Sequence, residues 1–325
     1  MEGFPIDAVI TWVDGNDPAH RAKRKAFLTD KAEDRSDDIG GATRFSSSGE
    51  IFFCIGSILR FAPFVRKIFI VTDCQDPHTD DFIHRNFPDT GTEVEVVDHR
   101  VIFRGYEQYL PTFNSLSIET MLYRIPGLSE HFVYFNDDMF LMRGISRDDW
   151  FEGGKTVLLA DRFSVTAARL LRAVKLPKGG HRPFGYKDAM LNAARILGSS
   201  CFWLFPHGPV ALSRSWYERF YSGNADVLEN NIRHRFRDAS QYNPQSLYTI
   251  DAVRSGQCVV RSPRGKALFI KEESGKANYM ERKLREADSG RDLAYGCINS
   301  MDKAPENDRA MFVEWICNRL KIKIL

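Results

Sequence analysis

The sequence predicts an α/β protein built around a layered sheet, and two observations support this class. In the first half of the chain, short apolar runs rich in β-branched residues alternate with runs of helical spacing. Three of the apolar runs end at acidic residues, namely Asp14, Asp73 and the pair Asp137-Asp138. Strands that alternate with helices are typical of layered α/β folds. Because ligands of open α/β sheets bind beyond the carboxyl ends of the strands, these acids indicate one shared site.

The elements expected in the first half follow from periodicity and from turn residues. Residues 6–13 form an apolar run that stops at a dense Asp-Gly-Asn-Asp-Pro turn signal, and residues 50–61 have apolar side chains near helical spacing on one face. Residues 92–98 alternate between apolar and polar, as half-buried strands do. The expected order is strand 6–13, helix 19–32, helix 50–61, strands 67–72 and 92–98, helix 114–123 and strand 131–135.

The second half has a less regular pattern, although its length still permits a single domain. A chain of 325 residues can form one large domain or one core with an inserted subdomain. We find no internal repeat and no low-complexity segment. The expected elements are strand 156–160, helices 187–197 and 216–232, a strand pair within 254–270, a polar turn at 297–302 and a closing helix at 301–320.

Composition and charge exclude several classes of protein. With 43% apolar and 27% charged residues, the chain has the composition of an ordinary globular protein. Its net charge of +2 gives no overall basic field, so no nucleic-acid partner is expected. The six cysteines form no CxxC pair and no zinc-like spacing with histidine, which suits a reducing compartment. No signal peptide and no apolar run of about 18 residues is recognisable, so we expect a cytoplasmic protein without a transmembrane helix.

The run Asn136-Asp137-Asp138 directly follows an apolar strand and is a candidate metal or catalytic site. Two adjacent carboxylates suit a divalent cation, because magnesium prefers hard oxygen ligands and often shares them with substrate phosphates. The alternative is that these acids only cap the next turn.

The loop TWVDGNDP at residues 11–18 also has two interpretations. Trp12 could pack in the core, and Asp14-Gly15 could form only a turn. The functional alternative is that the glycine lets backbone amides approach a nucleotide or a phosphate.

The second half contributes a histidine and two arginines as candidates. His207 stands between proline and glycine in the run Phe-Pro-His-Gly-Pro, a rigid setting that can direct an imidazole into a cleft. Its near-neutral pKa suits a general base, and a surface histidine is the alternative. Arg235 and Arg237 lie in a basic run that is either a solvated helix end or a guanidinium clamp on diphosphate oxygens.

In this order, these segments resemble the conserved blocks of the Stealth family. That family includes bacterial capsule hexose-1-phosphate transferases and the lysosomal-targeting GlcNAc-1-phosphotransferase. Where family members usually follow the last block with an acid, this chain has Ser300. The matching blocks are IDAVITWVDGNDP (6–18), a second block from Arg44 to Leu141 that includes LPTFNSLSIE (110–119) and IPGLSEHFVYFNDDMFL (125–141), HGP (207–209) with RFR (235–237), and CIN (297–299).

The resemblance implies a GT-A-like, Rossmann-type core with helices on both faces of its sheet. Residues 1–150 would bind a nucleotide-sugar, and residues 151–325 would form a helical or mixed acceptor-side region that completes the same catalytic domain. The implied reaction transfers a hexose-1-phosphate, for example GlcNAc-1-phosphate. An acceptor hydroxyl attacks the β-phosphorus of the donor, a nucleoside monophosphate leaves, and a phosphodiester joins two sugars. The alternatives are a conventional glycosyltransferase that forms glycosidic bonds and a non-catalytic surface-interaction protein.

The resemblance also implies roles for individual residues. Asp138 and Asn299 would bind Mg²⁺ or Mn²⁺, His207 is the first candidate for the general base, and Asp137 is the second. Arg237 would stabilise charge on the diphosphate. The remaining substrate-binding candidates are Thr11, Trp12, Val13, Asp14, Gly15, Asn16, Thr72 and Asp73 for the nucleotide, Asn114 and Ser115 for the sugar phosphate, Asn136 at the acidic turn, Arg235 at the diphosphate, and Arg44 and Arg60, whose role is either at the diphosphate or structural.

The partners expected by the same resemblance are a donor and an acceptor sugar. The donor is expected to be UDP- or GDP-linked, and the acceptor is an oligo- or polysaccharide of a capsule or cell surface. Peripheral association with the inner face of a membrane is expected by analogy with capsule enzymes. The sequence leaves the donor base and the oligomeric state open.

Overall fold

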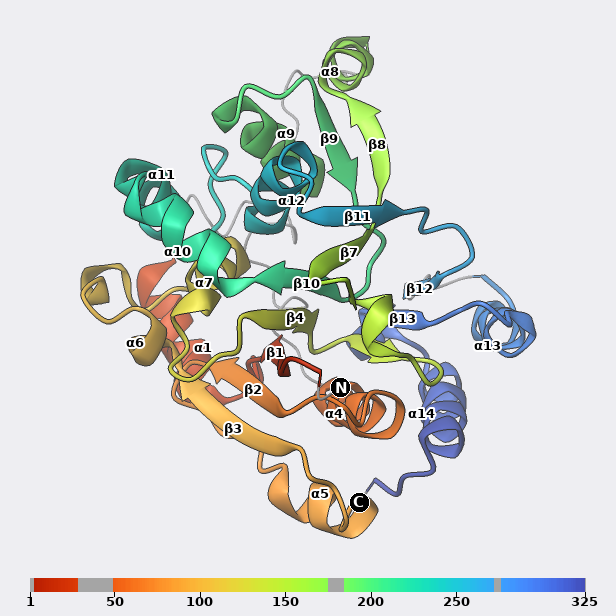
Figure 1. Ribbon diagram of the computed structural model, residues 1–325. Helices are drawn as coiled ribbons and strands as arrows, with labels where there is room; N and C mark the ends of the chain where they lie inside the picture. The colour runs from red at the N-terminus through yellow and green to blue at the C-terminus, as the bar shows by residue number, and fades with distance from the viewer. Residues whose placement is uncertain (1–2, 29–48, 175–183, 272–275, 325) are drawn as a thin grey trace.

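The computed structural model describes residues 3–28, 49–174, 184–271 and 276–324. At its centre is a five-stranded sheet with the strand order β10-β4-β1-β2-β3 (Figure 1). Four strands are parallel and β10 is antiparallel to its neighbour β4. The strands are β1 (Ile6–Thr11), β2 (Lys67–Thr72), β3 (Glu93–Asp98), β4 (His131–Asn136) and β10 (Val210–Ser213).

Strand register brings four polar residues to one edge of this sheet. Thr11 pairs with Asn136 across β1 and β4, and Thr72 pairs with Asp98 across β2 and β3. Each is the last residue of its strand. The carboxyl ends of the parallel strands therefore form one polar edge, where ligands of open α/β sheets bind.

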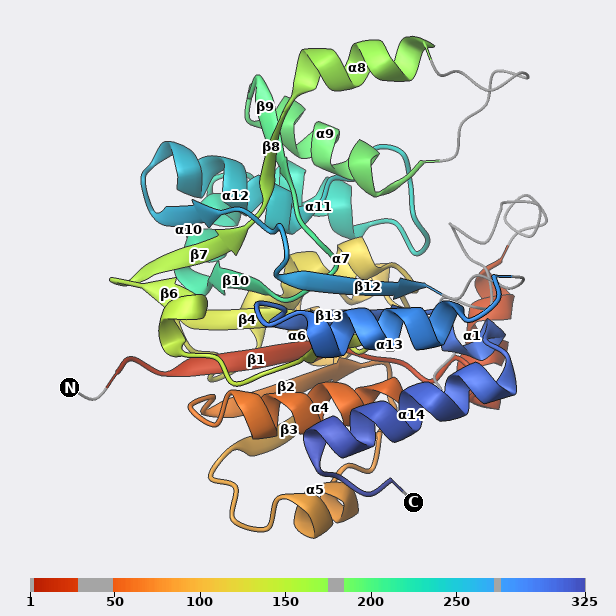
Figure 2. The same cartoon turned by 90° about the vertical axis from the view of Figure 1, so that its right-hand side faces the viewer.

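The two faces of the sheet belong to two hydrophobic clusters, because successive side chains of a strand point to opposite faces. In β1, Ile6, Ala8 and Ile10 pack with helices α4 (Glu50–Phe61) and α14 (Glu306–Leu320), which lie side by side in the lower half of Figure 2. Val9 is buried in the other cluster. That cluster is built from helices α7 (Ser115–Met121), α9 (Tyr186–Ile196), α10 (Arg214–Ser222), α11 (Ala225–Ile232) and α12 (Pro244–Arg254).

A second sheet joins the two halves of the chain. Strand β5 (Met139–Leu141) follows β4 after a two-residue turn and pairs antiparallel with β13 (Tyr295–Asn299). Strand β13 also pairs in parallel with β12 (Ala267–Lys271). Since β13 comes from the end of the chain, this sheet holds the C-terminal region against the turn that follows β4.

The other described elements surround these two sheets. The remaining strands form the sheet β11-β7-β6 and the pair β8-β9. Their bounds are β6 (Phe151–Glu152), β7 (Lys155–Leu159), β8 (Asp161–Ser164), β9 (Cys201–Leu204) and β11 (Cys258–Arg261), and the remaining helices are α1 (Pro18–Phe27), α5 (Asp80–Asn86), α6 (His99–Ile102), α8 (Val165–Val174) and α13 (Tyr279–Ser289), with 3-10 turns at Glu107–Tyr109, Leu122–Arg124, Arg147–Asp149 and Met301–Lys303.

The predicted α/β class with helices on both faces of the sheet is confirmed, and so is the order of elements in the first half. Helix α4 and strand β2 have the predicted bounds. The predicted helix 19–32 corresponds to α1, which ends at Phe27, and residues 29–32 lie outside the described part.

Three expectations for the second half were wrong. The single helix 216–232 is two helices, α10 and α11, separated by Gly223 and Asn224. The strands within 254–270 do not pair with each other, because β11 pairs with β7 and β12 pairs with β13. Residues 297–299, expected in a polar turn, belong to the buried strand β13. The second half is therefore richer in strands than predicted, and β10 and β13 join sheets that contain strands of residues 1–150.

Candidate active site

The ends of β1 and β4 are connected by a buried tyrosine. Thr11 Oγ1 donates to the Tyr134 hydroxyl at 3.0 Å, and that hydroxyl donates to Asn136 Oδ1 at 2.5 Å. Tyr134 is 5% exposed, so these bonds form away from bulk water. A hydrogen bond in such surroundings is electrostatically stronger than one in water. The tyrosine therefore fixes the starting points of the loop after β1 and of the acidic turn after β4.

Asp138 lies in the acidic turn between β4 and β5, and its three oxygen atoms differ in their hydrogen bonds. Its backbone carbonyl accepts a hydrogen bond from the Ile298 amide at 2.9 Å. Its Oδ2 accepts from Cys297 Sγ at 3.4 Å. Its Oδ1 is buried and has no hydrogen-bond partner among the described residues. A buried acceptor without a partner is costly, so this oxygen is suited to a ligand that the site receives from outside.

Electrostatics around the turn favour a bound cation. Burial raises the pKa of Asp138 to about 6, with Glu50 at the start of α4 adding to the rise. Burial, Asp138 and Glu50 together raise the pKa of Asp137 well above its usual value. Carboxylates that repel each other in a partly dry site are stabilised in their charged form by a positive charge. The turn is therefore a place where a divalent cation or a basic group would bind favourably.

The two predicted metal ligands, Asp138 and Asn299, suit magnesium if water and substrate phosphates supply the other ligands. Asp138 offers the unpartnered Oδ1, and the Asn299 side chain is within hydrogen-bonding reach of the same carboxylate. Asn299 Oδ1 accepts a hydrogen bond from Ser300 Oγ at 2.6 Å. In the described ranges no three His, Cys, Asp or Glu side chains are grouped as a metal site. Magnesium usually takes one or two carboxylates and completes its shell with water and substrate phosphates, so this set is sufficient. The metal itself stays a prediction.

His207 lies beside the second sheet, in the loop between β9 and β10. Its ring stacks on Phe269 with centroids 4.2 Å apart and planes inclined by 17°. Phe269 pairs in register with Cys297, so both side chains lie on one face of the sheet. Cys297 in turn contacts Asp138. The packing lowers the pKa of His207 by burial, although the residue remains exposed enough to meet solvent.

Arg237 reaches the same edge from the other side. One of its terminal nitrogens donates to Ser115 Oγ at 3.2 Å, at the start of α7. Its charge also acts on Glu119, one helical turn further along. Glu119 accepts from Gln245 Nε2 at 2.8 Å. Burial raises the pKa of Tyr134, and the charge of Glu119 adds to the rise. Arg237 and the tyrosine that joins β1 and β4 therefore both act on Glu119 electrostatically.

The loops that follow β1 and β2 are bonded to each other. The Asp14 amide donates to Gln75 Oε1, and Gln75 Nε2 donates to the Asp14 carbonyl, both at 2.9 Å. The carboxylate of Asp73 forms an ion pair with Lys23 of α1 at 2.9 Å. Thr72 Oγ1 is buried without a hydrogen-bond partner in the described part of the chain. Asn16 donates its amide to Asp14 Oδ1 at 2.8 Å, so Asp14 orders its own turn.

Several predicted site residues have structural roles. Trp12 is 8% exposed and packs in the core. Asn114 is 1% exposed, and its side chain caps α7 and binds Gln241 and the His234 carbonyl, which leaves it unable to line a pocket. Val13 and Gly15 stay in the loop after β1, and Arg44 lies outside the described residues.

Two predicted arginines bind backbone carbonyls. Arg60 donates to the Leu320 carbonyl at 2.9 Å and lies over the Phe87 ring, at the end of α4 opposite to Glu50. Its structural alternative is therefore the one that the contacts support. Arg235 donates to the carbonyls of Gln108 and Leu110 and lies 4.8 Å from the centre of the Phe27 ring.

Sequence reasoning missed four residues of the site, namely Glu50, Glu119, Tyr134 and Cys297. Glu50 is the first residue of a helix whose position was predicted, and Tyr134 lies two residues before Asn136 on the same face of its strand. Glu119 lies four residues after Ser115, which is the spacing of neighbours on a helix surface. Cys297 stands in the CIN run (297–299), but no local signal indicates its contact with Asp138, because that contact joins residues that are 159 positions apart.

Two family models match segments of the first half of the chain. Residues 4–32 match the family model of Stealth protein CR1, conserved region 1, and residues 44–158 match that of Stealth protein CR2, conserved region 2. A capsular polysaccharide phosphotransferase of Haemophilus influenzae is 30% identical over 306 residues, which cover 91% of this chain and 78% of the relative. A capsular polysaccharide phosphotransferase of Neisseria meningitidis serogroup B is 40% identical over 259 residues, covering 76% and 64%.

One further relative differs in length. An exopolysaccharide phosphotransferase of Streptomyces coelicolor is 32% identical over 307 residues, covering 94% of this chain, and the chain spans about half of it (53%). Among solved structures, the galactosyltransferase LgtC aligns with 98% of this chain and 97% of its own at 10% identity and a TM-score of 0.46. The bifunctional glycosyltransferase WbbM aligns with 97% of this chain and 50% of its own at 11% identity and a TM-score of 0.49. Likeness at this level carries no functional argument.

Proposed function

The chain belongs to the Stealth protein family, and from this premise we propose that it is a sugar-phosphate transferase. It moves a hexose-1-phosphate, such as GlcNAc-1-phosphate, from a nucleotide-diphosphate sugar to a sugar hydroxyl of a capsular or cell-surface polysaccharide. The relatives from Haemophilus influenzae and Neisseria meningitidis are named capsular polysaccharide phosphotransferases. Their names support this activity, and the site described above supports it independently.

The single observation that carries the proposal is the carboxylate oxygen Oδ1 of Asp138, which has no hydrogen-bond partner in the part of the chain that the structure describes. This buried oxygen stands after β4, whose end Tyr134 joins to the end of β1. The charges of Arg237 and of Glu119 act on each other, and Glu119 also acts on the same tyrosine. A diphosphate needs cationic partners and a metal-binding carboxylate close together, which this edge can supply.

The proposed reaction is a phosphoryl-type transfer. A bond forms between the acceptor hydroxyl oxygen and the β-phosphorus of the donor, and the bond between that phosphorus and the bridging oxygen breaks. The nucleoside monophosphate leaves with the bridging oxygen, and the hydroxyl proton passes to a base. Such transfers depend on positioning and on neutralisation of charge more than on covalent catalysis.

Each role is assigned to a side chain of the described site. Arg237 neutralises charge on the diphosphate through its guanidinium, and Ser115 orients that group. His207 accepts the hydroxyl proton, since its lowered pKa keeps the imidazole neutral near pH 7. Asp138 and Asn299 would hold a divalent cation, which would offset negative charge that develops on the leaving group.

The experiment that tests the function is a donor screen scored by the nucleotide released. Purified protein is incubated with UDP-GlcNAc, GDP-mannose and related donors, together with a capsule oligosaccharide and Mg²⁺ or Mn²⁺. Release of UMP or GMP, with a phosphodiester in the product, is the expected result. Release of UDP or GDP with a glycosidic product would instead establish a conventional glycosyltransferase. Asp138→Asn run in parallel shows whether any activity arises from this site.

Peripheral membrane association belongs to the same proposal and is supported by helix α8. No helix in the described ranges is both long and apolar enough to span a bilayer. Helix α8 projects at the top of the molecule in Figures 1 and 2. Leu170 and Leu171 on this helix are 63% and 61% exposed, and Phe163 in the preceding strand is 42% exposed. Exposed arginines 162 and 169 flank these apolar side chains, a combination that suits an anionic lipid surface.

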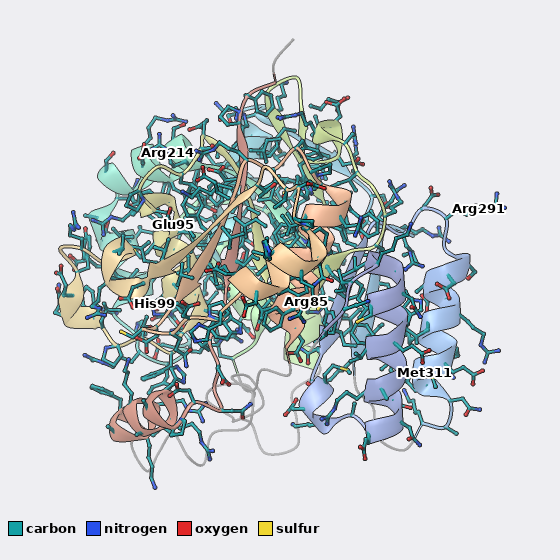
Figure 3. All side chains as sticks on the ribbon, turned by 90° about the horizontal axis from the view of Figure 1, so that it is seen from below. Arg85, Glu95, His99, Arg214, Arg291 and Met311 are labelled. Atoms are coloured by element: carbon teal, nitrogen blue, oxygen red, sulfur yellow. The ribbon has the colours of Figure 1, made fainter. Side chains whose placement is uncertain are left out.

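The membrane contact is tested by co-sedimentation with vesicles. We expect binding to vesicles that contain phosphatidylglycerol, weaker binding to pure phosphatidylcholine, and loss of binding in Leu170→Ser with Leu171→Ser. Met311→Ser is the matched control, because Met311 is 39% exposed on α14, distant from α8 (labelled in Figure 3). Equal vesicle binding by the double variant and the native protein would contradict the lipid contact.

A further inference from the structure

Sulfur atoms surround the acidic turn between β4 and β5. Cys54 Sγ of α4 donates to the Asn136 carbonyl at 3.8 Å, and the Asn136 amide donates to Met139 Sδ at 3.4 Å. Cys297 Sγ of β13 donates to Asp138 Oδ2 at 3.4 Å. Of these three contacts, only the one from Cys297 involves a carboxylate of the turn. The proposed function assigns a role to that carboxylate but none to the thiol.

Two consecutive residues of β13 hold Asp138 by different atoms. Cys297 binds the side chain, and Ile298 donates its amide to the Asp138 carbonyl at 2.9 Å. Asp138 is therefore held both at its backbone carbonyl and at its carboxylate. With Oδ2 engaged by the thiol, the orientation of the carboxyl group is set, and Oδ1 is the oxygen that remains without a partner in the described residues.

Strand β13 provides a rigid support for the thiol. Cys297 is 1% exposed and lies in the middle strand of the sheet β12-β13-β5. The preceding Gly296 lies directly against the Phe140 ring, where an added Cβ would be 2.4 Å from ring carbons. This close contact fixes the position of β13 beside its neighbour β5. The packing of the sheet therefore sets the distance from the thiol to the acidic turn.

From this geometry we infer that Cys297 is a positioning residue, whose thiol orients Asp138 so that Oδ1 is presented to the divalent cation. The inference rests on the proposed function, because that function assigns the cation to Asp138. A thiol is a weak hydrogen-bond donor, so it can set the orientation of a carboxylate without strongly reducing its negative charge. Groups that hydrogen-bond to a metal ligand without binding the metal themselves typically contribute about 10- to 100-fold to metal affinity.

The test compares substitutions at two buried thiols of the same turn. Cys297→Ala removes the donor to Asp138, Cys297→Ser retains a donor, and Cys297→Val removes the donor while filling the space. Cys54→Ala is the matched control, because Cys54 is buried and contacts the same turn only at a backbone carbonyl. The measurements are the Kd for Mn²⁺ by electron paramagnetic resonance, the Mg²⁺ concentration for half-maximal release of nucleoside monophosphate, and the thermal unfolding midpoint.

We expect Cys297→Ala and Cys297→Val to weaken Mn²⁺ binding by about 10-fold or more, Cys297→Ser to stay close to the native protein, and Cys54→Ala to leave the Kd unchanged. A native Kd in folded Cys297→Ala or Cys297→Val would overturn the inference, and so would equal weakening in Cys54→Ala. A native protein that binds Mn²⁺ but releases no nucleoside monophosphate from any donor would refute the proposed function alone. One that releases it without binding Mn²⁺ would refute this inference and the assignment of the cation to Asp138 and Asn299, but not the transfer reaction.

Discussion

Thr11, the last residue of β1, is paired in register with Asn136, the last residue of β4, and the Tyr134 hydroxyl bonds to both side chains. The pairing matters because the segments that begin at these two residues carry the loop after β1 and the acidic turn. A rigid connection at their origin holds the two segments at a constant separation. Catalysis that depends on positioning is sensitive to such connections, since small displacements of the reacting groups are costly.

Tyr134→Phe tests this connection. The change leaves Thr11 Oγ1 and Asn136 Oδ1 without their shared partner, so we expect the free energy of unfolding to fall by about 1–3 kcal/mol. We also expect kcat/KM to fall, because both loops gain freedom at their starting points. Urea denaturation and the nucleotide-release assay check the two effects. Tyr109→Phe serves as the control, since the Tyr109 hydroxyl makes an exposed bond to Glu229, and a similar loss there would argue against a specific role for Tyr134.

Asp138→Asn should separate activity from stability. The variant loses the charge that would hold the cation in the proposed function, so we expect release of nucleoside monophosphate to fall by at least about 100-fold. The folded state raises the pKa of Asp138 to about 6, which means that the ionised carboxylate is disfavoured by folding at neutral pH. The neutral amide should therefore leave the thermal unfolding midpoint at pH 7 unchanged or higher. Near-native turnover in this variant would remove Asp138 from the mechanism.

His207 should control the acid side of the pH profile. As a general base it works only when neutral, so kcat/KM should decrease as pH falls through its pKa, which burial holds below the usual value. His207→Ala should lower kcat/KM by about 100-fold and abolish that decrease. Phe269→Leu keeps His207 but exposes more of its imidazole to solvent. The pKa of His207 should then rise, so the decrease in kcat/KM should move to higher pH. A profile that is unchanged in His207→Ala would assign the proton transfer to another group.

Much of the first half of the fold could be predicted, because its signals are local. The bounds of α4 and β2 follow from the spacing of apolar residues within each segment. The acids at the strand ends could be found for the same reason, since a turn after an apolar run is visible in the sequence. Their convergence followed from the general rule that parallel strands of one sheet share a carboxyl edge.

The rest of the site depends on contacts between distant residues. The second half supplies β13, whose pairing with β5 brings Cys297 to Asp138, and no short-range pattern encodes that pairing. Arginine roles were ambiguous for a chemical reason, because a guanidinium donates equally well to phosphate oxygens and to backbone carbonyls. Arg237 binds Ser115 near the site, whereas Arg60 and Arg235 bind carbonyls that hold chain segments together.

His99 offers a test of the buried polar groups beside β3. The residue is the first of α6 (labelled in Figure 3), is 2% exposed, and has a buried Nδ1 without a hydrogen-bond partner among the described residues. Burial lowers its pKa to about 4, against the attraction of Asp73 and Asp98 and with a smaller contribution from His20 and Lys23. The folded state therefore disfavours the protonated imidazole.

The sign of the effect on stability follows from this lowered pKa. Above pH 6.5 the imidazole is neutral in both states, and as pH falls from 6.5 to about 4 the unfolded chain binds a proton that the folded protein does not. The contribution of His99 to the free energy of unfolding is thus lost on acidification, by about 3 kcal/mol between pH 8 and pH 4. His99→Gln, which does not titrate, should show a loss smaller by that amount when urea denaturation is compared at the two pH values. Equal losses in the native protein and the variant would show that another group causes the acid sensitivity.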